Sequence, residues 1–139
     1  MRLEPLYRLT FRYIRTATVD VGDERHQFLE AEGRCEGKVS GNFRGANRAR
    51  RRSGGGPFEP DYHGVIETED GATILWDLTG YGFPDEGRAV VTIKHLAQDE
   101  RYTWLNERLC AGNVTLVRGD DATDFVVDVG ELLWEPPAD

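Results

Sequence analysis

The stretch His63–Gly82, HGVIETEDGATILWDLTGYG, indicates the fold of this chain more clearly than any other segment. Two runs rich in β-prone residues, 65–68 and 73–79, flank a turn that contains Asp-Gly. Asp-Gly between two such runs is a strong signal of a β-hairpin. Every second residue around Trp76 is a large apolar one, which predicts that the Trp76 side chain points toward the interior.

Strand patterns continue on both sides of this hairpin. Residues 6–14 alternate between apolar and polar side chains, 88–97 follow as a strand, and 114–118 pair with 123–134 around a Gly-Asp-Asp turn. Shorter strands are predicted at 19–21, 27–35 and 38–43. Strands do not alternate with helices, so an antiparallel barrel or sandwich is favoured over a parallel sheet.

The segment 99–109 differs because its apolar residues recur at helical spacing. Asp99 suits the N-cap position and Gly112 suits the residue after the last turn. Tyr102, Leu105 and Leu109 fall on one helical face. We therefore expect a mainly β fold, a single barrel domain over residues 1–139, with one short α-helix near residues 99–109.

The composition is that of an ordinary globular protein. Of 139 residues, 39% are hydrophobic and 30% are charged, and no apolar run approaches the roughly 20 residues that span a bilayer. The N-terminus lacks the apolar region of a signal peptide, so we expect a cytoplasmic protein with no membrane partner. Cys35 and Cys110 stand alone, which argues against a zinc site; buried free thiols are expected unless the fold brings them within disulfide range.

Positive charge is concentrated in one segment of an acidic chain. The formal net charge is −8, but residues 37–58 hold six cations and no acid, including the stretch 44–56, RGANRARRRSGGG. We predict a flexible Arg/Gly-rich loop at 44–56, and two further interpretations are a flap over a small anionic ligand and a nucleic-acid contact. The acidic remainder and the lack of interleaved aromatic residues argue against nucleic acid as a partner.

Several motifs resemble a known family. They are ETEDGATILWDLTG at Glu67–Gly80, RYTWLN at Arg101–Asn106, the opening strand Leu3–Phe11 and the closing stretch 126–134. Together they are similar to the "domain of unknown function 3237" family of bacteria and fungi. The resemblance implies an antiparallel, calycin-like or lipocalin-like β-barrel with a central cavity, and it implies no assigned reaction.

The chain departs from the family pattern at three places. A Gly-Gly-x-Asp-Trp segment of many members is replaced by Gly45–Ala49, an Arg-Tyr pair by His63-Gly64, and a tyrosine of the last strand by Gly130. If those family residues line the cavity, the ligand of this chain differs from that of its relatives.

Three residues are candidates for acid–base catalysis. Asp61 and His63 are two apart, so on a strand they share a side, and a carboxylate beside an imidazole can orient it as a general base. A hydrogen-bonded loop entering a strand explains the same pair. His95 shares a face with Val91 and Ile93, where it could serve as acid, base or ligand, or be a core histidine with a satisfied ring.

Five residues are candidates for ligand contacts. Trp76, Tyr81, Phe83 and Trp104 supply aromatic walls, and Arg48 supplies a contact for an anion. Trp104 has a second interpretation, as part of a plug that closes one end of the barrel. No metal cluster or cofactor-binding motif is present, so no metal or cofactor is expected.

These features support three hypotheses about function. In the first, the barrel binds a small hydrophobic or anionic molecule, such as an aromatic or polyketide-like acid, in an interior apolar pocket. In the alternative, the same cavity is the site of a cofactor-free enzyme, of the isomerase, cyclase or lactone hydrolase type. In the third, the barrel is filled and serves only interactions. The sequence leaves a homodimer open, since edge strands can pair.

Overall fold

Strands dominate the structure. The computed structural model describes residues 1–52 and 54–138, and over these residues it contains nine β-strands and two short 3-10 helices. They are β1 (Arg2–Val21), β2 (Glu24–Gly37), β3 (Gly41–Asn47), β4 (Arg50–Arg52), β5 (Asp61–Thr68), β6 (Thr73–Phe83), η1 (Pro84–Glu86), β7 (Arg88–Ala97), η2 (Thr103–Glu107), β8 (Cys110–Arg118) and β9 (Thr123–Leu133).

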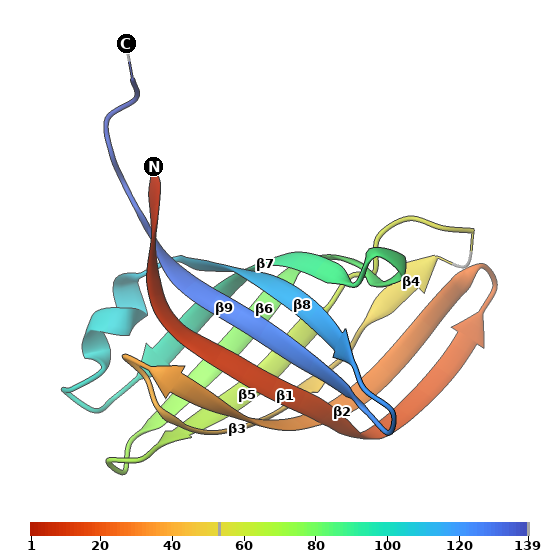
Figure 1. Ribbon diagram of the computed structural model, residues 1–139, viewed down its shortest axis with the longest axis horizontal. Coiled ribbons are helices and arrows are strands. Elements are labelled where there is room, and N and C mark those ends of the chain that lie inside the picture. The colour runs from red at the N-terminus through yellow and green to blue at the C-terminus, as the bar shows by residue number, and fades with distance from the viewer. Residues whose placement is uncertain (53, 139) are drawn as a thin grey trace.

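The strands form one antiparallel sheet that closes on itself (Figure 1). The order is β1-β9-β8-β7-β6-β5-β3-β2-β4, and β1 also pairs with β2. Tyr7 of β1 accordingly lies opposite Val129 of β9 on one side and Gly37 of β2 on the other. This ring of strands confirms the predicted antiparallel barrel and excludes the sandwich.

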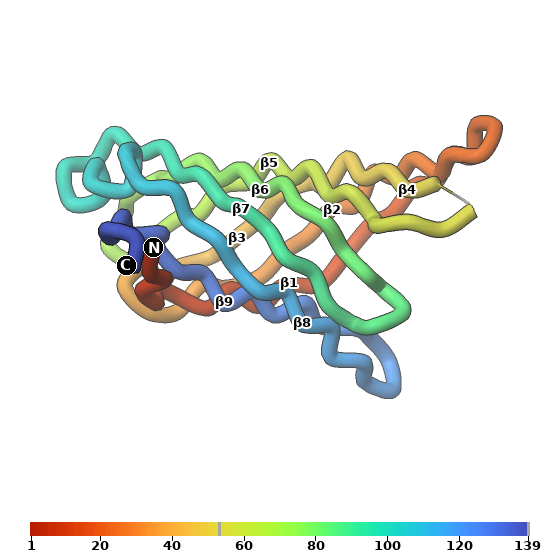
Figure 2. The backbone as a smooth tube through the Cα atoms, turned by 90° about the horizontal axis from the view of Figure 1, so that it is seen from above, coloured from red at the N-terminus to blue at the C-terminus, as the bar shows by residue number. Residues whose placement is uncertain are grey.

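The two ends of the barrel differ. The end that carries η2, which we call the closed end, also holds both chain termini and the turn between β5 and β6 (Figure 1). The opposite end, which we call the open end, carries β4, η1 and the turns between β1 and β2 and between β8 and β9. Figure 2 shows the β1–β2 hairpin reaching past the neighbouring strands at this open end.

The helix is shorter than predicted and of a different type. The α-helix expected near residues 99–109 is instead η2, which is built on 3-10 turns. Asn106 explains why the chain turns back there: its amide accepts from the backbone N–H of Ala97 and donates to the Ala97 carbonyl. Leu105 is fully buried, so η2 covers the closed end. No helix in the described part of the chain is long and apolar enough to cross a membrane.

The arginine-rich stretch expected as a loop at 44–56 is partly strand. Its first residues belong to β3, and β4 (Arg50–Arg52) pairs with Glu24–His26 of β2. The strand geometry separates like charges, because neighbouring side chains point to opposite faces. Arg51 is partly buried, whereas Arg50 is exposed.

The first hairpin is longer than predicted. The strands expected at 6–14 and 19–21 are one continuous β1, and the strand expected at 27–35 extends to become β2. The pairing register shifts between Tyr13 and Arg15, where the alternating sequence pattern ends. Gly22 supplies the turn, since its φ of 61° lies in the left-handed region.

The core fills the barrel from the closed end toward the middle. Leu9 of β1, Ile66 of β5 and Trp76 of β6 are fully buried, so the prediction that Trp76 points inward is confirmed. Cys35 and Cys110, whose pairing the sequence left open, are both free and buried. Gly33 of β2 allows the close approach of β1, because a Cβ there would lie 2.7 Å from the Phe11 Cα.

Candidate functional site

The open end of the barrel contains a cavity of about 450 Å³. Most of its wall is apolar, because inward-facing residues of β1, β2, β6, β8 and β9 converge there. They include Phe11, Leu29, Leu78, Leu116 and Phe125. An interior space of this size and character fits a small, largely apolar molecule.

Aromatic rings form one wall of the cavity. Phe11 and Phe125 stack with ring centroids 5.1 Å apart and an interplanar angle of 7°. Tyr62 packs edge-on against Phe11 at 5.5 Å, and Tyr13 lies 4.8 Å from Phe125. These contacts hold the rings in place, so the wall is rigid before any ligand arrives.

Three polar side chains meet at this aromatic wall. We call Tyr13 and Tyr62 the tyrosine pair, and Asn47 supplies the amide that contacts it. The hydroxyls of Tyr13 and Tyr62 are in hydrogen-bond contact. Asn47 donates from Nδ2 to the Tyr13 hydroxyl at 3.2 Å, and its Oδ1 accepts from the backbone N–H of Asp61 at 2.8 Å. The second bond fixes which way the amide points, so Asn47 can only donate to Tyr13.

Both phenols of the tyrosine pair stay protonated at neutral pH. Burial raises the pKa of Tyr62 well above its ordinary value. Burial also raises the pKa of Tyr13, and the hydrogen bonds from Tyr62 and Asn47 only partly offset that effect. The cavity therefore presents neutral hydroxyls rather than phenolates.

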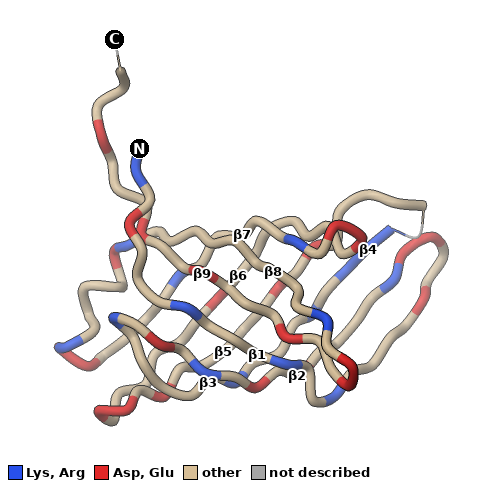
Figure 3. The backbone as a smooth tube through the Cα atoms, viewed as in Figure 1, with Lys and Arg blue, Asp and Glu red and all other residues tan. Residues whose placement is uncertain are grey.

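Three arginines line the mouth of the cavity: Arg25, Arg51 and Arg88. Each has an acidic partner, and Figure 3 shows basic and acidic positions side by side near β4 and the η1 turn. Arg25 Nε lies 2.9 Å from Asp20 and Arg88 Nη2 lies 2.8 Å from Glu86.

Arg51 has the loosest of these pairings. Its Nη2 lies 3.7 Å from Asp85 Oδ2, and the Asp85 side chain is 92% exposed. An exposed pair at that distance contributes little free energy, so the Arg51 guanidinium is available to a ligand. Arg51 is the member of the arginine-rich stretch that reaches the cavity, because it is the inward residue of β4.

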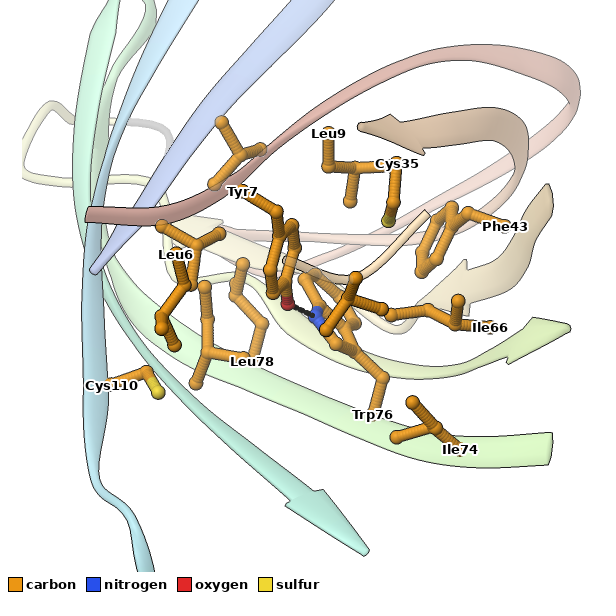
Figure 4. Close-up of a cluster of buried hydrophobic side chains, with 14 of the residues drawn as sticks. Leu6, Tyr7, Leu9, Cys35, Phe43, Ile66, Ile74, Trp76, Leu78 and Cys110 are labelled. Atoms are coloured by element: carbon orange, nitrogen blue, oxygen red, sulfur yellow. Dashed lines mark hydrogen bonds between the residues drawn. The ribbon is translucent and has the colours of Figure 1, made fainter. Parts of the chain in front are cut away.

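A second polar cluster is buried in the core toward the closed end, and Figure 4 shows two of its members, Tyr7 and Trp76, in contact. Trp76 donates from Nε1 to the Tyr7 hydroxyl at 2.9 Å, and that hydroxyl lies 2.6 Å from His95 Nε2. Since the indole can only donate, the Tyr7 proton is free to go to Nε2. Neutral His95 then carries its proton on Nδ1, which lies 3.9 Å from Cys110 Sγ.

The groups of this lower cluster are held uncharged by burial. Burial lowers the pKa of His95 to about 4 and raises the pKa of Tyr7 well above its ordinary value. Burial also raises the pKa of the Cys110 thiol to about 11 and of the Cys35 thiol to about 12. These groups serve the packing of the closed end, and they do not line the cavity.

The three residues predicted for catalysis do not meet in the cavity. Asp61 and His63 do lie together, with His63 Nε2 3.4 Å from Asp61 and Nδ1 2.8 Å from Asp77. They stand on the outer wall, however, where the His63 side chain is 70% exposed. His95 lies in the closed end, so the three candidates share no site.

The five residues predicted for ligand contacts are also dispersed. Phe83 lines the cavity. Trp76 is buried beneath it, and Trp104 sits on η2 at the opposite end of the barrel. Arg48 and Tyr81 border a second hollow on the outer wall, where the Arg48 guanidinium approaches His26 at 3.3 Å.

Sequence reasoning did not select the tyrosine pair, its amide, Arg25 or Arg88, and it included Arg51 only within the stretch 44–56, for which a flap over a small anionic ligand was one interpretation. A signal was present for Tyr62, because alternation along β5 places it opposite Asp61 and His63. A second signal was present for Tyr13, which follows Leu9 and Phe11 at every second position of β1. Nothing local marks Asn47, which becomes part of the site through the pairing of β3 with β5.

No family model and no curated protein matches this sequence. Solved structures do resemble the fold. A β-barrel-like protein from Acinetobacter baumannii is 20% identical, with a TM-score of 0.76 over 94% of each chain. A conserved protein of unknown function from Rhodopseudomonas palustris is 18% identical, with a TM-score of 0.77 over 95% of this chain and 97% of that one.

A third similar structure is described as an enzyme from Penicillium herquei. It is 22% identical, with a TM-score of 0.72 over 92% of this chain and 93% of that one. At these identities the likeness extends to the fold and not to a function. The chain is thus a β-barrel of the same architecture as these proteins.

Proposed function

We propose that this chain binds a small, largely apolar anion in the cavity at the open end of the barrel. The observation that carries the proposal is the combination of a cavity of about 450 Å³ with aromatic walls and arginines at its mouth. Pockets for small molecules are mostly apolar with a few placed polar groups, which matches this arrangement.

The preference for an anionic ligand follows from the three arginines at the mouth of the cavity. Guanidinium groups pair well with carboxylate, sulfonate and phosphate oxygens, and Arg51 is the least committed of the three. The acidic partners Asp20, Asp85 and Glu86 are absent from the described lining of the cavity. An anionic group at the mouth therefore meets arginine N–H groups before it meets a carboxylate.

Two matched dyes test this proposal. Anilinonaphthalene sulfonate is an anion, and phenylnaphthylamine is the same ring system without the sulfonate. Fluorescence titration should give tighter binding of the anion to the wild-type chain. Arg51→Gln should weaken the anion about tenfold, the loss of one charged hydrogen bond, and leave the uncharged dye unchanged.

The control is Arg44→Gln, which makes the same charge change on the outer wall, where Arg44 pairs with Glu67. It should leave both dyes unaffected. Equal losses for Arg44→Gln and Arg51→Gln would refute the role of the mouth. Failure of both dyes to bind the wild-type chain would refute the proposal as a whole.

A second candidate is a cofactor-free enzyme in the same cavity. Two observations favour it: neutral tyrosine hydroxyls stand inside an apolar cavity, and a protein of similar fold is described as an enzyme. The described lining holds no carboxylate or imidazole, so Tyr13 and Tyr62, rather than Asp61, His63 or His95, are the groups that could move a proton.

Hydrolysis of an aromatic lactone, dihydrocoumarin, tests this candidate; isomerisation and cyclisation remain the other reaction classes. The wild-type chain should accelerate the reaction over buffer, and the double variant Tyr13→Phe/Tyr62→Phe should lose the acceleration. The same rate with and without protein would count against lactone hydrolysis.

A further inference from the structure

We infer that Tyr13 and Tyr62 form a donor site for an uncharged acceptor oxygen, such as a ketone or phenol oxygen of the ligand. This inference rests on the proposed function, since it names what the inner part of the same cavity recognises. The ligand class is then a ring system with a carbonyl or hydroxyl oxygen at its inner end and an anionic group at its outer end.

The pair is built by three strands that lie close together in the barrel wall, because β3 and β5 are paired and β1 lies across β2 from β3. Tyr13 lies on β1, Asn47 on β3 and Tyr62 on β5. Asn47 is fully buried and Tyr62 nearly so, whereas Arg25 and Arg51 stand at the mouth. A molecule in the cavity therefore meets the hydroxyls deeper than it meets the guanidinium groups.

Counting protons shows that the pair is incomplete. Tyr13 and Tyr62 carry two hydroxyl protons, and the contact between them uses one. Asn47 contributes a donor to Tyr13 and offers no acceptor, because its Oδ1 is taken by the Asp61 N–H. Among the hydrogen bonds of residues 1–52 and 54–138, the second hydroxyl proton has no acceptor.

The spare proton is present whichever way the pair is oriented. If Tyr13 donates to Tyr62, the Tyr62 proton is left, and if Tyr62 donates to Tyr13, the Tyr13 proton is left. Both rings border the cavity. A buried donor without a partner is costly, so a ligand oxygen placed there gains more than it would at a site already satisfied.

The lower cluster shows that this deficit is specific to the cavity. There the Trp76 proton goes to Tyr7, the Tyr7 proton to His95 and the His95 proton toward Cys110. Each donor of that chain has an acceptor inside the protein. The tyrosine pair therefore differs from an ordinary buried polar cluster by one missing acceptor, and the cavity is where that acceptor would sit.

The dye Prodan tests the inference. It is uncharged, so the mouth arginines do not dominate its binding, and its ketone emission moves to longer wavelength when the oxygen accepts a hydrogen bond. Prodan bound to the wild-type chain should emit at longer wavelength than Prodan bound to the double variant Tyr13→Phe/Tyr62→Phe. The double variant should also bind it about three- to tenfold more weakly.

The single variants give the sharpest result. Tyr13→Phe and Tyr62→Phe each leave one phenol with one free proton, so each should keep most of the wild-type emission shift. Only the double variant loses it, which makes the effects strongly non-additive. Tyr81→Phe on the outer wall is the control and should leave the emission unchanged.

The outcomes separate the two proposals. Identical Prodan emission from the wild-type chain and the double variant, with the dye bound to both, would overturn the donor site alone. Absence of Prodan binding to a wild-type chain that still binds anilinonaphthalene sulfonate would also overturn the donor site alone, whereas absence of binding by all the dyes would overturn the proposed function, and with it this inference. Thermal unfolding of each variant verifies that the barrel has formed.

Discussion

Tyr7 and Tyr13 stand on the same strand, β1, and both rings lie within the barrel, but one is at the closed end and the other at the open end. Around Tyr7, donors and acceptors are matched and side chains fill the space. Around Tyr13, a donor is left over and a cavity begins. The same residue type therefore serves packing in one place and suits recognition in the other, according to what its neighbours leave unsatisfied.

The difference in filling has a structural cause. At the closed end η2 inserts Leu105, and Val39 after β2 is likewise fully buried. At the open end the β1–β2 hairpin runs outward, away from the neighbouring strands (Figures 1 and 2). The nearest elements are β4, which consists of three arginines, and the short turn η1, and neither places a large apolar side chain across this end.

Truncation of a large ring should show the greatest contrast between the two ends. Trp76→Ala opens a void in the filled core and should lower the free energy of unfolding by about 3–5 kcal/mol. Phe125→Ala enlarges an existing cavity and should cost about 1–2 kcal/mol. Chemical denaturation of both variants measures the difference, and equal losses would remove the distinction between the ends.

Acid should destabilise the folded protein through His95, which is buried in the closed end. His95 has its pKa lowered to about 4 from an ordinary 6.5, so the unfolded chain binds its proton more readily. The contribution of neutral His95 to the free energy of unfolding is therefore complete above pH 6.5. It is lost as the pH drops through 4, and the total loss is about 3 kcal/mol.

Unfolding measured across that pH range tests the effect, and His95→Gln should flatten the slope. The groups that face His95 are Tyr7 and Cys110, and the pKa of each is raised, so neither titrates in this window. An unchanged slope in His95→Gln would assign the acid sensitivity elsewhere.

A matched pair of oxygen deletions compares the two tyrosines directly. Tyr7→Phe leaves both Trp76 Nε1 and His95 Nε2 without a partner and should cost about 2–3 kcal/mol. Tyr13→Phe removes the acceptor of one donor, Asn47 Nδ2, and should cost less, about 1–2 kcal/mol. Thermal unfolding gives both values, and a larger loss for Tyr13→Phe would reverse the assignment of the two clusters.

The smallest expected effect concerns the mouth. Asp85→Asn removes the carboxylate that competes for Arg51, while the exposed pair itself contributes little to stability. Affinity for anilinonaphthalene sulfonate should rise about two- to fivefold, and affinity for phenylnaphthylamine should stay the same. A gain for both dyes would point to a change in cavity shape instead of charge.

Much of the fold could be predicted from local signals. The Asp-Gly turn and alternation of the strands at 65–68 and 73–79 match β5 and β6, and the strand at 88–97 coincides with β7. The α-helix predicted at 99–109 was wrong. Tyr102, Leu105 and Leu109 follow helical spacing, but the hydrogen bonds between Asn106 and Ala97 end the helix early. Hydrogen bonds between two separate segments produce no periodic pattern in the sequence, so they could not be predicted from it.

The site was less predictable because it depends on register. The sequence analysis placed candidate residues on the correct strand, β5, but on the wrong face. It selected Asp61 and His63, which lie on the outer face, whereas Tyr62 faces the cavity. Among the arginines, Arg48 was favoured, yet pairing of β4 with β2 turns Arg51 inward. The way the barrel closes determines which face of a strand points inward. The sequence of β4 or β5 alone does not contain that information.

The two buried thiols have a practical consequence. Only a thiolate reacts rapidly with an alkylating reagent, and both Cys35 and Cys110 are fully shielded, with pKa values raised to about 12 and about 11. Modification must therefore wait until strands separate and let the reagent enter. The rate at which the unaltered chain gains mass in iodoacetamide would then report how often its closed end comes apart, with no label introduced.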